Sequence, residues 1–563
     1  MEYLILLAVM LILFLFWVIA NLIRERQSRQ RFLAKLKNEY GKRPEKQYPV
    51  ERLLSMERHL EEPSASQDTY ILDDITCNDL DFERLFLRID RCFSAAGEEE
   101  LYRILRTSCF DPEELQNRRK LIEYFSGHEE ERIRLQMYFA GIGRSGKYSV
   151  RDYLDLIRDL DYKSPATDIC VIGLMIASVI LMFFNGSVGL FCLIGLLIFN
   201  FITYFREKEK ISPYITTFSY LLRLLVQAKG IESCGIEEIR EICDRIRERR
   251  EKFRSFERFS GFLTGGDQLS SNPMDVVMDY LRMGLHLNIM KFYSMLKTVR
   301  QEEKEMIAMM DDLGYIEAMI SAGEFAASLP YYCWAETGAA ENEKERFSAK
   351  ELYHPLVKEA VANDVAPKGN MLLTGSNASG KSTFLKTVAI AQILAQSLGI
   401  VPAREYITGF YRVCTSMALR DDLSGGRSYF IVEIESLKRI ADDAKTHGRS
   451  VMCFVDEVLR GTNTVERISA STQILESIAK SGAFCFAATH DIELTELLES
   501  CFENYHFREE IRGDDVCFDY KLRQGRAGSR NAIRLLSVMG YDEQIIDKAN
   551  ARAEHFLQTG EWK

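Results

Sequence analysis

A glycine-rich segment in the second half of the chain has the residue types and spacing of a phosphate-binding loop. It follows an apolar stretch, 371–374, that predicts a strand, and it opens a segment, 383–398, that predicts a helix. Glycines let such a loop curl until backbone N–H groups face phosphate oxygens, and the helix N-terminus adds a favourable dipole. The residues expected to bind a nucleotide here are Gly375, Ser376, Asn377, Ala378, Ser379, Gly380, Lys381, Ser382 and Thr383.

Charge and metal chemistry are expected from four side chains. Lys381 would neutralise the β and γ phosphates, and the Ser382 hydroxyl would help to hold Mg²⁺. Asp456 and Glu457 directly follow an apolar strand, where two carboxylates would be costly without a role. Asp456 is predicted to hold Mg²⁺, and Glu457 to orient or deprotonate the attacking water. The cofactors predicted are therefore ATP and Mg²⁺, and the activity is ATP hydrolysis.

A histidine follows a further apolar strand at 483–489. This strand delivers His490 to the edge of the sheet that also carries Glu457, if the two strands are parallel. A neutral imidazole at that place could sense the γ-phosphate. His490 is therefore predicted as a second catalytic residue.

The order of these motifs resembles the ATPase domain of the MutS family, which belongs to the ABC superfamily. The similarity runs from about Tyr353 to Phe556 and includes the phosphate loop with its Asn377, the segment 421–433, Asp456 and Glu457, 460–464 and 488–490. In that family the segment carrying Ser428 reaches the ATP of the opposite subunit, so the resemblance implies composite sites across a homodimer.

The same resemblance suggests how the rest of the chain is divided. It implies an ABC-type ATPase domain at 345–525 and a helical dimerisation element at 526–563. Upstream, apolar residues at helical spacing predict an all-α core and lever domain at 76–335. The fold class expected is thus an α/β P-loop ATPase domain plus an all-α domain that carries transmembrane helices. We expect the mismatch-recognition domain of the family to be missing.

Two apolar segments predict membrane spans. Residues 3–23 form an uncharged run long enough to cross the hydrocarbon core, which is roughly 30 Å thick. A second block, 169–204, is broken at 185–187 and predicts a helical hairpin inserted into the all-α domain. A cleaved signal peptide is the alternative for the first segment, and a buried core hairpin is the alternative for the second.

Flanking charges set the expected orientation. The anchor at 1–23 is followed by a basic juxtamembrane segment, 24–75, and the positive-inside rule keeps that segment in the cytoplasm. Three transmembrane helices contacting lipid then give a multi-pass protein of the cell membrane, with its N-terminus outside and its ATPase domain in the cytoplasm. The basic residues concerned are Arg24, Arg26, Arg29, Arg31, Lys35 and Lys37.

Composition narrows the function classes. The net charge of −11 argues against a surface built to coat nucleic acid, and the thirteen cysteines form no C-x-x-C pair. A stripe of Arg and Lys at 245–258 could contact phosphates, although a solvated helix face is favoured because glutamates interrupt it. The leading hypothesis is a membrane-anchored ATPase that drives a conformational change of helical levers. The alternatives are a DNA-binding protein of repair or recombination without mismatch specificity, and a transporter, neither of which is favoured.

Overall fold

The chain folds into two compact units in a computed structural model. The helical unit comprises Met1–Glu62, Ile89–Tyr102 and Leu121–Ser328, and the sheet unit comprises Pro63–Arg88, Arg103–Lys120 and Leu329–Lys563. Segments 76–88 and 103–120, which the helical pattern grouped with the core and lever, therefore lie in the sheet unit. The structure describes residues 2–44, 46–60, 69–257, 283–338, 347–376, 379–417, 429–459, 462–512, 515–527, 533, 536 and 540–561.

The helical unit is built around one long buried helix, α16. Most side chains of α16 from Met306 onward are buried. Its Gly314 allows close packing, because a Cβ there would lie 2.4 Å from the carbonyl oxygen of Ala96. The remaining elements surround α16. Apart from the helices described below, those assigned wholly or partly to this unit are α2 (Val50–Arg58), α5 (Ala95–Arg106), α6 (Pro112–Gly127), α7 (Glu129–Ile142), α8 (Val150–Arg158), η1 (Glu237–Ile239), α11 (Arg240–Glu251), α12 (Arg254–Glu257), α15 (Leu287–Gln301) and α16 (Glu303–Ala327).

A buried ion network joins α2 to α5. The Arg52 guanidinium donates to Glu98 Oε2 from Nε at 3.2 Å and from Nη2 at 2.9 Å, and the Arg144 Nε donates to Glu98 Oε1 at 2.7 Å. The side chains of Arg52 and Glu98 are 2% and 0% exposed. Burying two charges is tolerated only when they satisfy each other, so this network fixes how the two helices pack.

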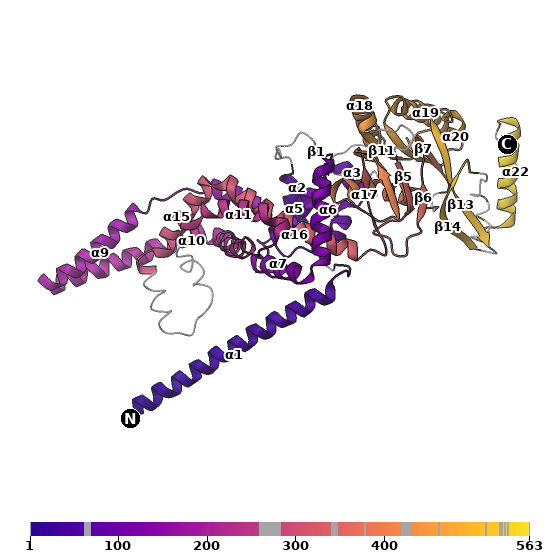
Figure 1. Ribbon diagram of the computed structural model, residues 1–563. Helices are drawn as coiled ribbons and strands as arrows, with labels where there is room; N and C mark the ends of the chain where they lie inside the picture. The colour runs from indigo at the N-terminus through magenta and orange to yellow at the C-terminus, as the bar shows by residue number, and fades with distance from the viewer. Residues whose placement is uncertain are drawn as a thin grey trace. The chain divides into compact units, whose positions relative to one another are not determined.

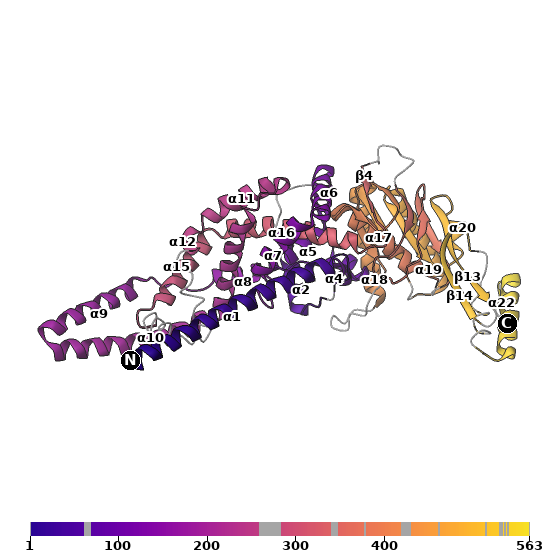
Figure 2. The same cartoon turned by 60° about the horizontal axis from the view of Figure 1, so that its bottom comes forward.

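An apolar helical hairpin, α9 (Ala166–Phe184) and α10 (Gly186–Ile231), extends from the helical unit, and the two helices lie side by side in Figures 1 and 2. Asn185 forms the turn, and its side chain accepts a hydrogen bond from the Val188 N–H at 3.4 Å. The second arm does not end near 204, as the hydropathy pattern suggested, because α10 continues through Pro213.

Both helices of the hairpin are long and apolar enough to cross a membrane, judged over the residues that the structure describes. Near the turn, Phe183, Phe184 and Phe191 are all more than 80% exposed. The N-terminal apolar run and the basic segment that follows it form one continuous helix, α1 (Glu2–Glu39).

The sheet unit is centred on a six-stranded sheet of order β10-β11-β12-β7-β13-β14, in which every neighbouring pair is parallel except β13 and β14. Strands β11 and β12 are buried along their whole length, as expected for a parallel sheet covered on both faces. The six strands are β7 (Asn370–Thr374), β10 (Arg412–Ser416), β11 (Val451–Asp456), β12 (Phe484–Thr489), β13 (Phe502–Arg512) and β14 (Asp515–Gln524).

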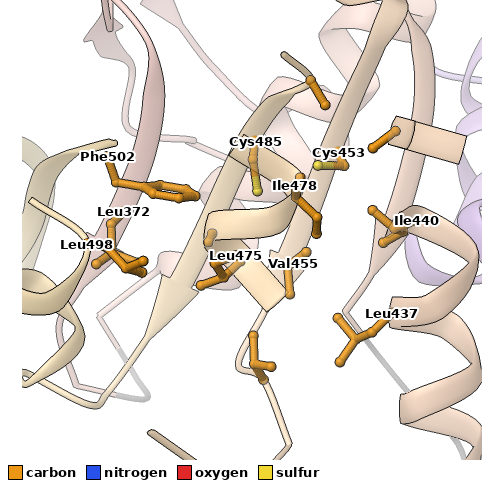
Figure 3. Close-up of a cluster of buried hydrophobic side chains, with 14 of the residues drawn as sticks. Leu372, Leu437, Ile440, Cys453, Val455, Leu475, Ile478, Cys485, Leu498 and Phe502 are labelled. Atoms are coloured by element: carbon orange, nitrogen blue, oxygen red, sulfur yellow. The ribbon is translucent and has the colours of Figure 1, made fainter. Parts of the chain in front are cut away.

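Apolar faces of two helices cover one side of this sheet. Leu437 and Ile440 of α18 and Leu475 and Ile478 of α19 point toward the strands in Figure 3, each pair at the i, i+3 spacing of one helix face. Helix α4 is shared with the helical unit, to which its last residue belongs. With α4 included, the helices of the sheet unit are α3 (Asp74–Asp79), α4 (Phe82–Ile89), α17 (Lys381–Ser397), α18 (Tyr429–His447), η3 (Gly448–Ser450), α19 (Thr464–Lys480), α20 (Leu494–Leu497) and α22 (Glu543–Thr559).

Smaller sheets complete this unit. The segment 63–88 of this unit is joined to β10 through α3, because Asp79 accepts hydrogen bonds from Thr415 Oγ1 at 2.7 Å and from the Met417 N–H at 2.9 Å. The strands form a four-stranded sheet of order β4-β9-β5-β6 and the pairs β1-β2 and β3-β8. Their bounds are β1 (Thr69–Ile71), β2 (Thr107–Cys109), β3 (Cys333–Trp334), β4 (Glu336–Thr337), β5 (Phe347–Leu352), β6 (Asn363–Val365), β8 (Ile400–Val401) and β9 (Glu405–Thr408).

The ion network of the helical unit predicts unequal effects of two arginine substitutions. Arg52→Ala should lower the free energy of unfolding by about 3 kcal/mol, because it leaves the buried Glu98 charge uncompensated. Arg58→Ala is the control: Arg58 pairs with Asp152 but is 63% exposed, so its loss should cost less than about 1 kcal/mol. Denaturant unfolding of the full chain in detergent, followed by circular dichroism, measures both, and equal effects would contradict the argument.

Candidate nucleotide-binding site

Parallel strand pairing brings the predicted site residues to one edge of the six-stranded sheet. Thr374 at the end of β7 pairs in register with Thr489 at the end of β12, and Asp456 at the end of β11 pairs with Ala488 of β12. The phosphate loop, His490 and the Asp456-Glu457 pair therefore follow three adjacent strand ends. In parallel α/β sheets, ligands bind at this carboxyl edge.

The loop after β7 is curled around its own lysine. Gly375 and Gly380 have φ angles of +148° and +102°, and a Cβ on Gly375 would lie 2.7 Å from Ser379 Oγ. The Lys381 ammonium donates to the carbonyl oxygens of Gly375 at 2.7 Å and Ser376 at 2.9 Å. A larger side chain at Gly375 would collide with Ser379, and residues other than glycine rarely adopt these two φ angles. The shape of the loop therefore requires both glycines.

The loop residues differ in exposure. Lys381 is buried, whereas Ser382 and Thr383, at the start of α17, are exposed. Asn377 and Ala378 lie outside the described residues, as does Ser428. The roles predicted for these three residues therefore remain predictions from the sequence.

The acidic pair continues from β11 into a strained turn. Asp456 is 5% exposed, and the backbone of Glu457 adopts a φ of +62°. The Glu457 N–H donates to the carbonyl oxygen of Ala488 at 2.8 Å, and Leu459 again has a positive φ, +59°. Left-handed backbone at residues other than glycine costs about 1 kcal/mol or more, so contacts around this turn must hold it.

His490 lies beside the predicted base. Its Nδ1 is 3.3 Å from Glu457 Oε1, and its Nε2 is 3.7 Å from Asp491 Oδ1. Hydrogen bonding to Glu457 raises the pKa of His490, although partial burial opposes this. The sequence suggested a neutral imidazole, but a neighbouring carboxylate favours the charged form. Asp491 is itself held by Arg467, at 2.9 and 2.6 Å.

A cavity of about 380 Å³ opens beside the phosphate loop. Its lining combines apolar, aromatic and a few polar side chains, which suits a flat heteroaromatic ring. Gly380 and Thr383 contribute to it, so a group bound there would be continuous with phosphates in the loop. The lining residues are Leu352, His354, Val357, Lys358, Glu359, Ala360, Val361, Asn363, Gly380, Thr383, Phe384, Thr387, Phe507 and Tyr520.

Two of these lining residues show how the cavity is fixed. Asn363 Nδ2 donates to the carbonyl oxygen of Tyr520 at 3.0 Å, and Asn363 Oδ1 accepts from the Leu522 N–H at 2.8 Å, so β6 holds β14 in place. Burial lowers the pKa of His354 to about 4, and its Nδ1 accepts from the Leu356 N–H at 3.2 Å. Sequence reasoning missed this cavity, since Tyr520 is remote in sequence from the loop and no motif marks it.

A parallel sheet with a glycine-rich loop after one strand and a carboxylate pair after another is typical of nucleotide-binding α/β domains. Comparison with known proteins agrees: residues 371–557 match the family model "MutS domain V". The sheet unit is thus similar to the ATPase-type domain of MutS proteins, and this similarity supports the MutS family for the chain.

Curated relatives point the same way. The DNA mismatch repair protein MutS of Natronomonas pharaonis is 32% identical over 318 residues, which cover 50% of this chain and 36% of the relative. The proteins of that name from Thermotoga maritima and Thermus aquaticus are 32% and 30% identical over 269 and 212 residues, covering 33% and 26% of their lengths. The aligned region thus spans about a third of these relatives or less.

The contact between His490 and Glu457 predicts a titration that depends on the carboxylate. Because the folded-state pKa of His490 is raised, the stabilisation by this pair is present while the imidazole is protonated and is lost as pH rises through that pKa. Glu457→Gln should therefore lower the pKa of His490, measured by NMR of ¹³C-labelled histidine. Glu499→Gln, which removes an exposed carboxylate paired with Arg526, should leave it unchanged. An identical titration in wild type and Glu457→Gln would refute the assignment.

Proposed function

We propose that the sheet unit binds and hydrolyses Mg-ATP. The observation that carries this proposal is the placement of the curled loop around Lys381 and the Asp456-Glu457 pair at one edge of a parallel sheet. Loop N–H groups and Lys381 bind the phosphates, and the cavity beside Gly380 accepts the base. The similarity to MutS domain V supports the same activity.

The residues present fit a magnesium ion of the nucleotide. Ser382 supplies an exposed hydroxyl at the start of α17, and Asp456 supplies a carboxylate at the end of β11, both oxygen donors of the kind that Mg²⁺ prefers. When bound, the ion would neutralise phosphate charge. Glu457 orients or deprotonates the attacking water, and the strained turn limits its freedom to rotate away from that position.

We also propose a homodimer with composite sites. MutS proteins act as dimers, and the resemblance of the segment before α18 implies that Ser428 contacts the ATP of the opposite subunit. Residues 526–563 would contribute to the dimer contact, and their described part includes α22. Nucleotide would then close two sheet units and move the helical levers.

The membrane is the proposed environment of α1, α9 and α10. Phenylalanines that are more than 80% exposed at the hairpin turn would be costly in water and are favourable in lipid. The basic half of α1 follows its apolar half without a break in the helix, as expected where a helix leaves the bilayer on the cytoplasmic side. The protein would then be multi-pass, with the sheet unit in the cytoplasm.

Binding of DNA through the stripe at 245–258 is not favoured. Arg245 and Arg249 both donate to Asp312, and Arg250 donates to Glu232 from Nε and Nη2, each at 2.9 Å. The interleaved Phe253 and Phe256 are fully buried. These cations are neutralised within the helical unit, so the stripe offers little charge for phosphates, although the relatives are named for DNA repair.

The ATPase proposal predicts different losses from two substitutions. Lys381→Ala should abolish binding of Mg-ATP, because it removes the charge inside the loop. Glu457→Gln should keep binding and slow hydrolysis by about 10²- to 10⁴-fold, the range attributed to a general base. Nucleotide binding and phosphate release by the purified full chain measure both effects. Lys480→Ala, which changes an exposed lysine of α19, is the control. Turnover by the wild type that does not exceed that of Glu457→Gln would defeat the proposal.

The membrane proposal predicts a shielded thiol. Cys192 of α10 is exposed on the protein surface, so lipid should protect it from a water-soluble maleimide in intact membranes. Single-cysteine variants retaining Cys192 or Cys234 are compared; Cys234, partly exposed in the helical unit, is the control and should react once the cytoplasmic side is accessible. Equal labelling of the two thiols before denaturation, or recovery of the protein without membranes, would exclude spanning by the hairpin.

A further inference from the structure

A buried carboxylate on α18 contacts the turn that carries the predicted base. Glu433 is 1% exposed, and its Oε1 accepts a hydrogen bond from the Leu459 N–H at 2.6 Å. Leu459 follows Glu457 by two residues. Glu433 is therefore linked to the end of β11 that carries the proposed base by a charge-assisted hydrogen bond, although it precedes Glu457 by 24 positions in the chain.

The turn from Glu457 to Leu459 needs such support. Both residues have left-handed backbone, with φ angles of +62° and +59°, and neither is a glycine. The turn is bonded at three places: the Glu457 N–H to Ala488, the Val458 carbonyl oxygen to Ser471 Oγ at 3.3 Å, and the Leu459 N–H to Glu433. Strained backbone persists only where surrounding contacts determine it.

The chemistry of the contact indicates a specific role. A buried carboxylate is costly, and an apolar side chain facing the same core would avoid that cost. Val458 and Leu459 already bury their side chains in the core cluster, at 4% and 6% exposure. The turn is therefore packed by apolar contacts, and these do not require a carboxylate at position 433. A carboxylate does supply a strong acceptor for the Leu459 N–H.

We propose that Glu433 is a positioning residue for ATP hydrolysis: by holding the Leu459 N–H, it fixes the left-handed turn that orients Glu457. This inference rests on the proposed ATPase activity. Glu433 does not touch the nucleotide; it acts through Glu457. Because Glu433 lies in the second turn of α18, the orientation of the base also depends on the position of that helix.

The test separates the effect of side-chain length from the effect of charge at position 433 in the full chain. Glu433→Gln keeps an acceptor oxygen at the same distance and should retain hydrolysis within about three-fold, since the lost charge weakens the bond without removing it. Glu433→Asp keeps the charge but is shorter by one methylene group, and it should slow single-turnover hydrolysis about ten-fold or more, because small misplacements of catalytic groups are costly. Glu433→Ala should behave like Glu433→Asp. The affinity for Mg-ATP should stay within about two-fold in all three variants, since the loop around Lys381 is untouched.

Controls separate positioning from stability. Glu435→Ala removes an exposed carboxylate of the same helix and should leave hydrolysis unchanged. Melting temperatures are measured for every variant, and Glu433→Asp with Glu433→Gln decides the question if Glu433→Ala does not fold. Wild-type hydrolysis by Glu433→Asp would overturn the inference. So would an equal loss in Glu433→Gln and Glu433→Asp, or a loss of affinity that parallels the loss of rate.

A second measurement does not depend on hydrolysis. The pKa of His490 reports the nearby Glu457 carboxylate, so Glu433→Asp should lower that pKa whereas Glu433→Gln should not. If the wild type binds nucleotide without hydrolysing it, the proposed function fails, and the titration still tests whether Glu433 orients Glu457. An unchanged titration in Glu433→Asp would overturn the positioning role.

Discussion

The candidate site depends on the parallel register of three strands. Because β12 lies between β7 and β11 and pairs with both, the carboxyl ends of all three strands meet at one edge of the sheet. A shift of one residue would turn every side chain of the shifted strand to the other face and separate the loop from the carboxylates. The buried, β-branched and aromatic residues of these strands fix that register, so the same apolar core that stabilises the sheet unit also assembles its polar edge.

The local parts of this arrangement could be predicted from the sequence, since each strand is a short apolar run that the phosphate loop, the Asp456-Glu457 pair or His490 follows or closes. The spans 371–374 and 483–489 correspond to β7 and β12, and Asp456 closes β11. Contacts between segments that are distant in the sequence could not be predicted. Tyr520 reaches the cavity beside Gly380 only because β14 pairs with β13, and Glu433 reaches Leu459 only because α18 packs on the sheet. No periodicity in the sequence encodes such contacts.

Buried charged side chains have different kinds of partner in the two units. In the helical unit, Glu98 is enclosed by Arg52 and Arg144, and the arginines at 245–250 bond to acidic residues, so charge is used to specify how helices pack. The sequence showed these cations as a stripe but could not show their partners, which come from distant segments such as α16. In the sheet unit, Asp456 is buried at the end of β11, Lys381 is buried in the loop after β7, and Glu433 of α18 bonds to the turn after β11. The loop that surrounds Lys381 also contributes Gly380 to the cavity, and this proximity of a buried charge to a cavity is why chemistry is assigned to the sheet unit.

Strain at Glu457 and Leu459 has a physical consequence for the site. A relaxed turn would let the Glu457 side chain sample several rotamers, each placing the carboxylate at a different distance from a water on the phosphate side of the loop. A turn held at Ala488, Ser471 and Glu433 restricts that sampling, and the contact with His490 restricts it further. These contacts come from β12, α19 and α18, so any motion of one element against the sheet would alter the orientation of Glu457, the proposed base. A left-handed turn of this kind can therefore make catalysis sensitive to the packing of helices that never touch the nucleotide.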